Sequence, residues 1–232
     1  MDGAGNVFIA DGPRVRKVSP HGRISPVAGN GTSGYSGDGG LATEAQLSYA
    51  GGVAVDGAGN LFFQDLFRIR KVSASGIITT VAGTGYYGQS GEGGLAIDTA
   101  ITASYSALAV DAMGNLFFLD GGRIRKVSPG GIITTVAGGG ALSGSSADGG
   151  PATSAQISPQ GVAVDGAGNL FIAEATRVRK VSSNGIITTI VDFGPAGSSD
   201  AQYTNSVAVD GAGNVYTADA INNVVRILQP MQ

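Results

Sequence analysis

The octapeptide VAVDGAGN at residues 53–60 recurs unchanged at 162–169 and 207–214 and as LAVDAMGN at 108–115, and its last five residues stand at 2–6. The spacing of its aspartate from copy to copy is 54, 55, 54 and 45 residues. A recurrence of this length is typical of a repeat protein, in which each unit buries its apolar faces against its neighbours. The five aspartates are Asp2, Asp56, Asp111, Asp165 and Asp210.

Within one repeat, four short stretches that contain aliphatic, aromatic or β-branched residues are joined by short turns. In the second copy they read GVAVD at 52–56, LFFQD at 61–65, RIRKV at 68–72 and GIITTVA at 76–82. Aromatic and β-branched residues favour strands, and glycine accepts the positive φ angles that tight turns need. Four antiparallel strands per repeat, with no helical stretch, are typical of a propeller blade. The sequence therefore predicts an all-β propeller of four-stranded antiparallel blades.

Two of the five copies are short of one strand. The first lacks its inner strand and the fifth lacks its outer strand, so 18 strands are expected. We predict one propeller domain over residues 1–232. Two alternatives stay open: a five-bladed ring with two incomplete blades, or a fragment of a six-bladed propeller completed by missing blades or by self-association. The expected repeats are approximately 1–51, 52–106, 107–160, 161–205 and 206–232.

Composition excludes several classes of partner and chemistry. The net charge is −3, which argues against a nucleic-acid partner, and no apolar run is long enough to span a membrane. The chain has no cysteine, so disulfides, thiol chemistry and cysteine-ligated zinc are not available to it. We therefore expect neither a nucleic acid nor a membrane as partner.

The ordered motifs resemble those of NHL-repeat β-propellers. These motifs are GVAVDGAGNLFFQD at 52–65, RIRKV at 68–72, GIITTVAG at 76–83 and the insert GYSGDGGLAT at 34–43. The insert-bearing variety is similar to bacterial NHL proteins and to the propeller of teneurins. The resemblance implies a toroid, commonly of six blades, that mostly binds proteins, glycans or RNA, although some relatives are metal-dependent lyases or lactonases. It also favours an extracellular or periplasmic location.

Three long glycine-rich inserts, at 34–47, 86–101 and 143–157, are expected to carry the binding surface, because propellers bind partners through exposed loops on a rigid scaffold. Each has a carboxylate at an equivalent place, which could instead cap a short helical turn. Tyrosines in or just after the inserts are natural contact residues. The predicted binding residues are Tyr35, Asp38, Tyr49, Tyr86, Tyr87, Glu92, Tyr105 and Asp148.

Carboxylates end the second strand of each repeat, and arginines begin the third strand in four of them. A hairpin holds the two groups close together, which predicts structural ion pairs, although a ring of them could also bind a polar ligand. The aspartates of the octapeptide are expected to cap turn amides, since the pattern lacks the alternating ligands and distal glutamate of a calcium loop. The predicted pairs are Asp11 with Arg14, Asp65 with Arg68, Asp120 with Arg123 and Glu174 with Arg177.

No catalytic constellation is evident. His21 is the only histidine, so a histidine-rich metal centre cannot be assembled, and a Ser–His nucleophile has no supporting groups. The sequence predicts no catalytic residue, metal ligand or cofactor. It indicates a non-catalytic binding or scaffold propeller for a protein or glycan on the insert face. The alternative is a calcium-dependent, lactonase-like or lyase-like hydrolase with its site at the channel mouth.

Overall fold

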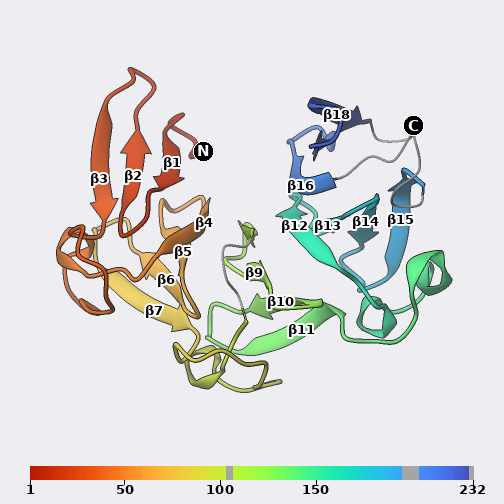
Figure 1. The fold of residues 1–232 in the computed structure, drawn as a ribbon, viewed down its shortest axis with the longest axis horizontal. Coiled ribbons are helices and arrows are strands. Elements are labelled where there is room, and N and C mark those ends of the chain that lie inside the picture. Colours follow the sequence, from red (N-terminus) through yellow and green to blue (C-terminus); the bar gives the residue numbers. More distant parts are fainter. Residues whose placement is uncertain (103–106, 195–203, 230–232) are drawn as a thin grey trace. The chain divides into compact units, whose positions relative to one another are not determined.

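The computed structural model describes residues 1–102, 107–194 and 204–229, and its regular structure there is almost entirely β-strand. Eighteen strands form five sheets, with three strands in the first and last sheets and four in the others (Figure 1). This confirms the predicted all-β propeller fold, including the two incomplete copies. Helical structure in the described ranges is limited to four 3-10 turns: η1 (Ala42–Glu44), η2 (Ala96–Asp98), η3 (Gly144–Ala147) and η4 (Ala152–Ser154).

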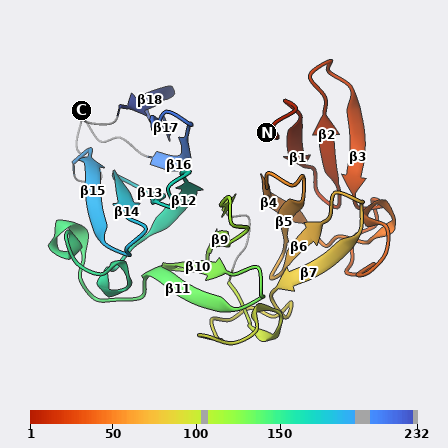
Figure 2. The ribbon, with the colours of Figure 1, turned by 180° about the vertical axis from the view of Figure 1, so that it is seen from behind.

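Each sheet is a meander of consecutive strands (Figures 1 and 2). The first contains β1 (Val7–Ala10), β2 (Val15–Val18) and β3 (Ile24–Ala28). The second contains β4 (Ala50–Val55), β5 (Leu61–Asp65), β6 (Ile69–Val72) and β7 (Ile78–Ala82). The third contains β8 (Leu108–Val110), β9 (Leu116–Leu119), β10 (Arg123–Val127) and β11 (Ile133–Gly138). The fourth contains β12 (Pro159–Val164), β13 (Leu170–Glu174), β14 (Arg177–Val181) and β15 (Ile187–Asp192), and the fifth contains β16 (Thr204–Val209), β17 (Val215–Asp219) and β18 (Val224–Leu228).

The chain divides into two compact units. The first is Met1–Leu116 with Val127–Ile133, and the second is Phe117–Lys126 with Thr134–Gln232. The first unit therefore holds the first and second sheets whole, and the second unit holds the fourth and fifth. The single domain over residues 1–232 and the repeat boundaries within it stay predictions.

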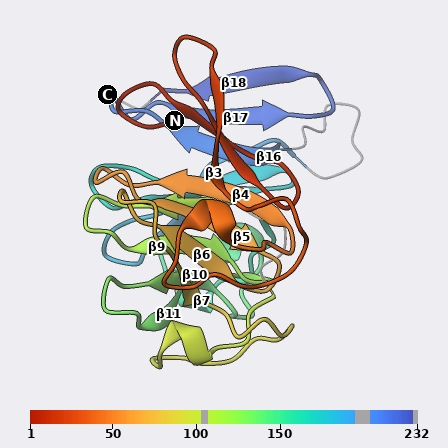
Figure 3. The same cartoon turned by 90° about the vertical axis from the view of Figure 1, so that its left-hand side faces the viewer.

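The core of the first unit lies around the second sheet, whose strands β4 to β7 are seen from the side in Figure 3. Every residue of β5 is buried, because both faces of a blade are covered in a repeat protein. Phe63 from this strand packs with Val15 of the first sheet and with Leu47 from the first insert. In the second unit, Phe171 and Val215 belong to one cluster that joins the fourth and fifth sheets.

Each insert lies along the edge of the outer strand that follows it. The backbone N–H of Gly39 donates to the Ile78 carbonyl at 2.8 Å, and the Ile78 N–H donates to the Gly40 carbonyl at 3.0 Å. An outer strand otherwise presents unpaired backbone groups to other chains, so the insert protects this edge. The same two bonds join Gly93 and Gly94 to Ile133, and Gly149 and Gly150 to Ile187.

Gly83 shows why a glycine ends the outer strand. Its φ is +90°, and a Cβ at this position would collide with the carbonyl oxygen of Phe67. The chain turns there from β7 into the next insert, and only glycine accepts this conformation and close approach without strain. Gly83, which follows Val81 and Ala82, therefore sets the direction in which the insert leaves the sheet.

Candidate functional site

Arg70, on β6, is the centre of a buried polar site in the first unit. Its side chain is fully buried, and its Nη2 donates to Asp38 Oδ1 at 2.7 Å and to the Ser36 carbonyl at 3.0 Å. Its Nη1 lies 3.2 Å from Oδ2 of Asp65, whose side chain is also fully buried. We call Arg70, Asp38 and Asp65 the first clasp. A buried charge needs partners that replace water, so the clasp ties the insert to the sheet.

The two carboxylates of the first clasp also accept hydrogen bonds from backbone amides. Asp65 Oδ1 accepts from the N–H of Ser48 at 2.7 Å and of Tyr49 at 3.0 Å. Asp38 Oδ2 accepts from the Thr80 N–H on β7 at 3.1 Å. The start of η1 has no side-chain cap, so the helical-turn cap considered as the alternative role of Asp38 is wrong. The carboxylate caps the edge of a strand instead.

The pKa of Asp38 follows from these contacts. Burial is the largest single influence and raises the pKa, but hydrogen bonds from Thr80 and the charge and hydrogen bond of Arg70 lower it. Together they hold the pKa below its ordinary value of 3.8. The carboxylate is ionised at neutral pH, which suits a clasp partner and does not suit a general acid.

The second unit contains an equivalent second clasp, formed by Arg179, Asp148 and Glu174. Arg179 on β14 is fully buried and its Nη2 lies 2.7 Å from Asp148 Oδ1. Its Nη1 is 3.8 Å from Glu174 Oε2, an ion-pair distance that is too long for a hydrogen bond. Asp148 Oδ2 accepts from the Thr189 N–H at 3.0 Å, as Asp38 does from Thr80. The third insert is therefore held to its sheet in the same way as the first.

Tyr35 contacts the first clasp through Asp38 and Arg70. Its hydroxyl donates to Asp38 Oδ2 at 3.2 Å and lies 2.9 Å from the Thr80 hydroxyl. The guanidinium carbon of Arg68 is 3.7 Å from the centroid of its ring, a cation–π contact that fixes the ring plane. The structure thus brings together two predicted binding residues, Tyr35 and Asp38, in a contact that holds the insert in place.

Three other predicted tyrosines lie at the surface. Tyr86 and Tyr87 in the second insert are 77% and 73% exposed, and Tyr49 is 46% exposed. The ring of Phe67 packs edge-on against Tyr87, with 5.6 Å between the centroids. Glu92 of the second insert is exposed, and Tyr105 lies outside the described residues. The binding role of all eight residues remains a prediction.

The ion pairs differ from the predicted ones in their arginine partner. Glu174 does pair with Arg177 at 3.6 Å, but the aspartates pair with the arginine two positions later in the strand. The earlier arginines point to the loop that leaves the outer strand, where Arg14 donates to the Asn30 carbonyl and Arg68 to the Thr84 carbonyl. This leaves the next arginine on the same face to reach the carboxylate. The observed pairs are Asp11–Arg16 at 2.7 Å, Asp65–Arg70 at 3.2 Å and Asp120–Arg125 at 3.3 Å.

Sequence reasoning missed the buried arginines. Arg70, Arg125 and Arg179 are at most 1% exposed, although arginine is almost never fully buried unless it is paired. The available signal was the alternation in RIRKV at 68–72, which places Arg70 with Arg68 and Val72 on one face of the strand and Ile69 and Lys71 on the other. Arg70 is in register with Phe63, and Asp65 lies two residues after Phe63 on the same face, so the alternation brings Arg70 within reach of that carboxylate.

The octapeptide aspartates cap their own turns, as predicted. Asp56 Oδ1 accepts from the N–H of Ala58 at 3.0 Å and of Asn60 at 2.8 Å, and Oδ2 accepts from the Asn60 side chain at 2.7 Å. The same three contacts recur in the other copies. In the last copy, Tyr216 also donates to Asp210 at 2.9 Å. That contact raises the pKa of Tyr216, and hydrogen bonds led by the Asn214 side chain lower the pKa of Asp210.

The described residues offer no preformed metal centre or membrane segment. Nowhere in residues 1–102, 107–194 and 204–229 do three or more His, Cys, Asp or Glu side chains gather so that they could hold a metal ion. His21 is exposed in the turn between β2 and β3. Among the same residues no helix has the length and apolar character needed to cross a membrane.

Known proteins share both the sequence motifs and the fold. The family model described as "Teneurin NHL domain" matches residues 30–90 and 141–202. Teneurin-m of Drosophila melanogaster is 30% identical over 172 residues, which is 68% of this chain but only 6% of that protein. It is a fly protein, so the expected similarity to bacterial NHL proteins stays a prediction.

Two solved structures of enzymes have a similar fold. Virginiamycin B lyase from Staphylococcus aureus gives a TM-score of 0.55 at 14% identity, covering 100% of this chain and 69% of that one. A gluconolactonase from Xanthomonas campestris gives 0.61 at 14% identity, covering 97% and 69%. At these identities the similarity shows the propeller fold alone.

Proposed function

Since this chain belongs to the teneurin NHL domain family, we propose that it is a non-catalytic binding and scaffold module whose contact surface is the face that carries the long inserts. The ligand we propose is a protein or a glycan. The family membership concerns a domain that makes up a small part of the relative it matches, so the partner of the whole relative is not transferred to this chain.

The exposed aromatic pair in the second insert is the observation that carries this proposal. Tyr86 and Tyr87 expose about three quarters of their surface, and the chain turns into their insert at Gly83, whose φ of +90° and close approach to Phe67 only glycine accepts. Tyrosine provides a large contact area at low cost in side-chain entropy, and its ring and hydroxyl suit both protein and sugar surfaces. Two adjacent exposed tyrosines on a supported loop are therefore well suited to ligand contact.

The test compares the chain with a Tyr86→Ser, Tyr87→Ser double variant. Both proteins are labelled and applied to a glycan array and to an array of extracellular proteins. We expect reproducible binding to one array, reduced about tenfold or more in the double variant, since two aromatic contacts are lost. His21→Ser, which changes an exposed turn residue elsewhere, is the matched control and should bind as the unaltered chain does. Equal binding by the double variant would overturn the proposal.

The rival function is a calcium-dependent hydrolase with its site at the channel mouth. Its support is the fold similarity to a lyase and a lactonase, which concerns the fold alone. Calorimetric titration with calcium separates the two functions, because the rival needs a saturable site. Saturable binding of calcium would favour the hydrolase. For the binding module we expect no heat of calcium binding.

We also propose that the chain can associate with itself through the fifth sheet. Three apolar side chains of β18 are exposed: Val224 by 43%, Val225 by 69% and Ile227 by 57%. Exposed apolar edge strands tend to find partners. Light scattering should therefore detect a dimer or larger species that Val225→Lys shifts to monomer, whereas a concentration-independent monomer would contradict self-association.

A further inference from the structure

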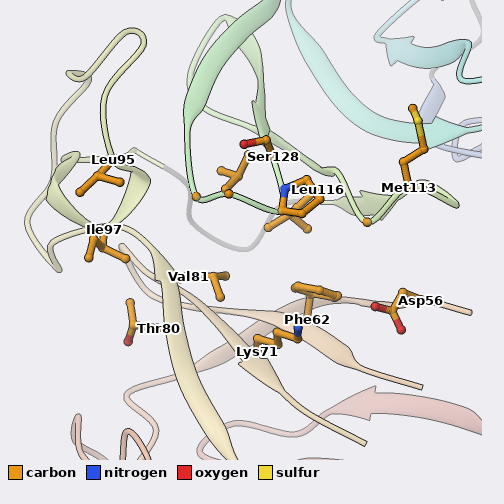
Figure 4. A pocket seen from close by; sticks show the side chains of 15 residues that line it. Asp56, Phe62, Lys71, Thr80, Val81, Leu95, Ile97, Met113, Leu116 and Ser128 are labelled. Carbon is orange, nitrogen blue, oxygen red and sulfur yellow. The ribbon is translucent and has the colours of Figure 1, made fainter. Parts of the chain in front are cut away.

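A groove of about 440 Å³ lies within the first unit, and none of the tyrosines proposed above as ligand contacts lines it (Figure 4). One wall comes from the second sheet and includes Phe62, Lys71 and Val81. The opposite wall includes Leu116 and the turn at 128–131, and Leu95 with Ile97 from the second insert closes one end. Phe62 and Leu116 are core residues, so the groove reaches from the surface to the apolar interior.

Two residues of this groove depart from their own repeat. The octapeptide turn reads DGAGN in four copies, but DAMGN at 111–115, where Met113 replaces alanine. The insert reads GGLAT at 39–43 and GGPAT at 149–153, but GGLAI at 93–97, where Ile97 replaces threonine. Met113 is 73% exposed and Ile97 is 49% exposed, and both line the groove. The alanines and threonines of the other copies show that the fold does not require a large apolar residue at either position.

The groove also contains a cation that lacks a carboxylate partner. The Lys71 ammonium lies over the ring of Phe62, 5.6 Å from its centroid, and forms no ion pair with any described residue. Asp56 lies on the same groove, but its carboxylate already accepts three hydrogen bonds from its own turn. An anion in the groove would therefore meet one unpaired positive charge among apolar side chains.

We propose that this groove binds a small amphipathic carboxylate, an alkyl or aryl chain that carries one carboxylate group. The alkyl or aryl group of the ligand lies against Ile97, Val81 and Leu116, and its carboxylate pairs with Lys71. A volume of about 440 Å³ is in the range of small-molecule sites. A stable protein partner would instead need a contact of about 800 Å² on each side, far larger than this groove provides.

Octanoate and 1-octanol are suitable probes, because they share an alkyl chain and differ in charge. The protein contains only three methionines, so labelling the methionine methyl groups gives a simple NMR spectrum. The signal that disappears in Met113→Ala is that of Met113. We expect octanoate to shift that signal in a saturable way while the Met1 signal stays in place. No saturable shift up to about 10 mM octanoate, which corresponds to a binding free energy weaker than about 3 kcal/mol, would overturn the proposal.

Three variants test the two parts of the site. Ile97→Thr restores the residue of the other inserts and should weaken both probes about fivefold, since threonine offers the alkyl group less apolar contact than isoleucine does. Lys71→Gln should weaken octanoate about tenfold and leave octanol unchanged. Lys180→Gln is the matched control, because Lys180 lies 5.8 Å from the ring centroid of Phe171 in the second unit, and it should change neither affinity. Octanoate affinity that is unchanged by Ile97→Thr or by Lys71→Gln would overturn the assignment.

Discussion

Arg16 and Arg70 occupy the same place in two neighbouring copies of the repeat, but their surroundings differ. Both are the middle arginine of an R-x-R-K-V strand in the first unit. The Arg16 side chain is 41% exposed and pairs with Asp11 at 2.7 Å, whereas Arg70 is fully buried between Asp65 and Asp38. The difference comes from the first insert, which supplies Asp38 and the Ser36 carbonyl to Arg70. The same strand motif can therefore carry a surface pair or a buried clasp, depending on what packs over it.

The largest expected effect comes from removing the arginine itself. Arg70→Met leaves Asp65 buried without its cation, and losing one partner of a buried pair costs about 3–5 kcal/mol of unfolding free energy. Arg16→Met breaks an exposed pair and should cost about 0–1 kcal/mol. Urea denaturation of the two variants measures the contrast. Similar losses in both would show that burial by the insert does not distinguish the two sites.

The carboxylates that end the second strands should give a smaller contrast. Asp65→Asn keeps the shape of the side chain but removes charge-assisted hydrogen bonds to two amides and to Arg70, which are worth about 1.5–3 kcal/mol. Asp11→Asn changes a residue that is 52% exposed, and we expect a loss within about 0.5 kcal/mol. The same urea measurement applies. A loss for Asp11→Asn that matches or exceeds that for Asp65→Asn would contradict the comparison.

The strands could be predicted because their signals are local. The sequence placed the second strand of copy two at 61–65 and the third at 68–72, and the structure has β5 at Leu61–Asp65 and β6 at Ile69–Val72. Alternation of apolar residues and glycine turns determines these elements within a few residues. The incomplete first and last copies could be recognised for the same reason.

The clasp could not be predicted in full, because its partners are distant in sequence. Asp38 and Arg70 are separated by 32 positions and meet only when the insert has folded along β7. The sequence indicated that loop carboxylates recur at equivalent places, but nothing local specified Thr80 and Arg70 as their partners. The groove was missed for a related reason: Met113 and Ile97 lie in different loops, and each alone is an ordinary apolar residue.

Replacing the insert carboxylate should separate insert docking from sheet stability. Asp38→Asn keeps Arg70 paired with Asp65, so we expect a loss of only about 1 kcal/mol in unfolding free energy. The Thr80 amide donates to Asp38 Oδ2, and its hydrogen exchange should therefore become faster by about fivefold. Asp148→Asn is the matched variant in the second unit and should act on the Thr189 amide alone. Unchanged exchange at Thr80 would indicate that the insert is held without Asp38.

The smallest effect concerns pH and tests the charge on Asp38 directly. The folded pKa of this carboxylate is lowered, so its ionised form stabilises the fold at pH values above its ordinary pKa of 3.8. This stabilisation is lost as the pH falls below about 3.8 and through the lower folded pKa, because protonation removes the ion pair with Arg70. An NMR titration of the Asp38 carboxyl carbon should give a midpoint below 3.8, and Arg70→Met should move it upward. A midpoint at or above 3.8 in the unaltered chain would mean that the insert carboxylate is not paired in solution, and Arg70 would then differ from Arg16 only in burial.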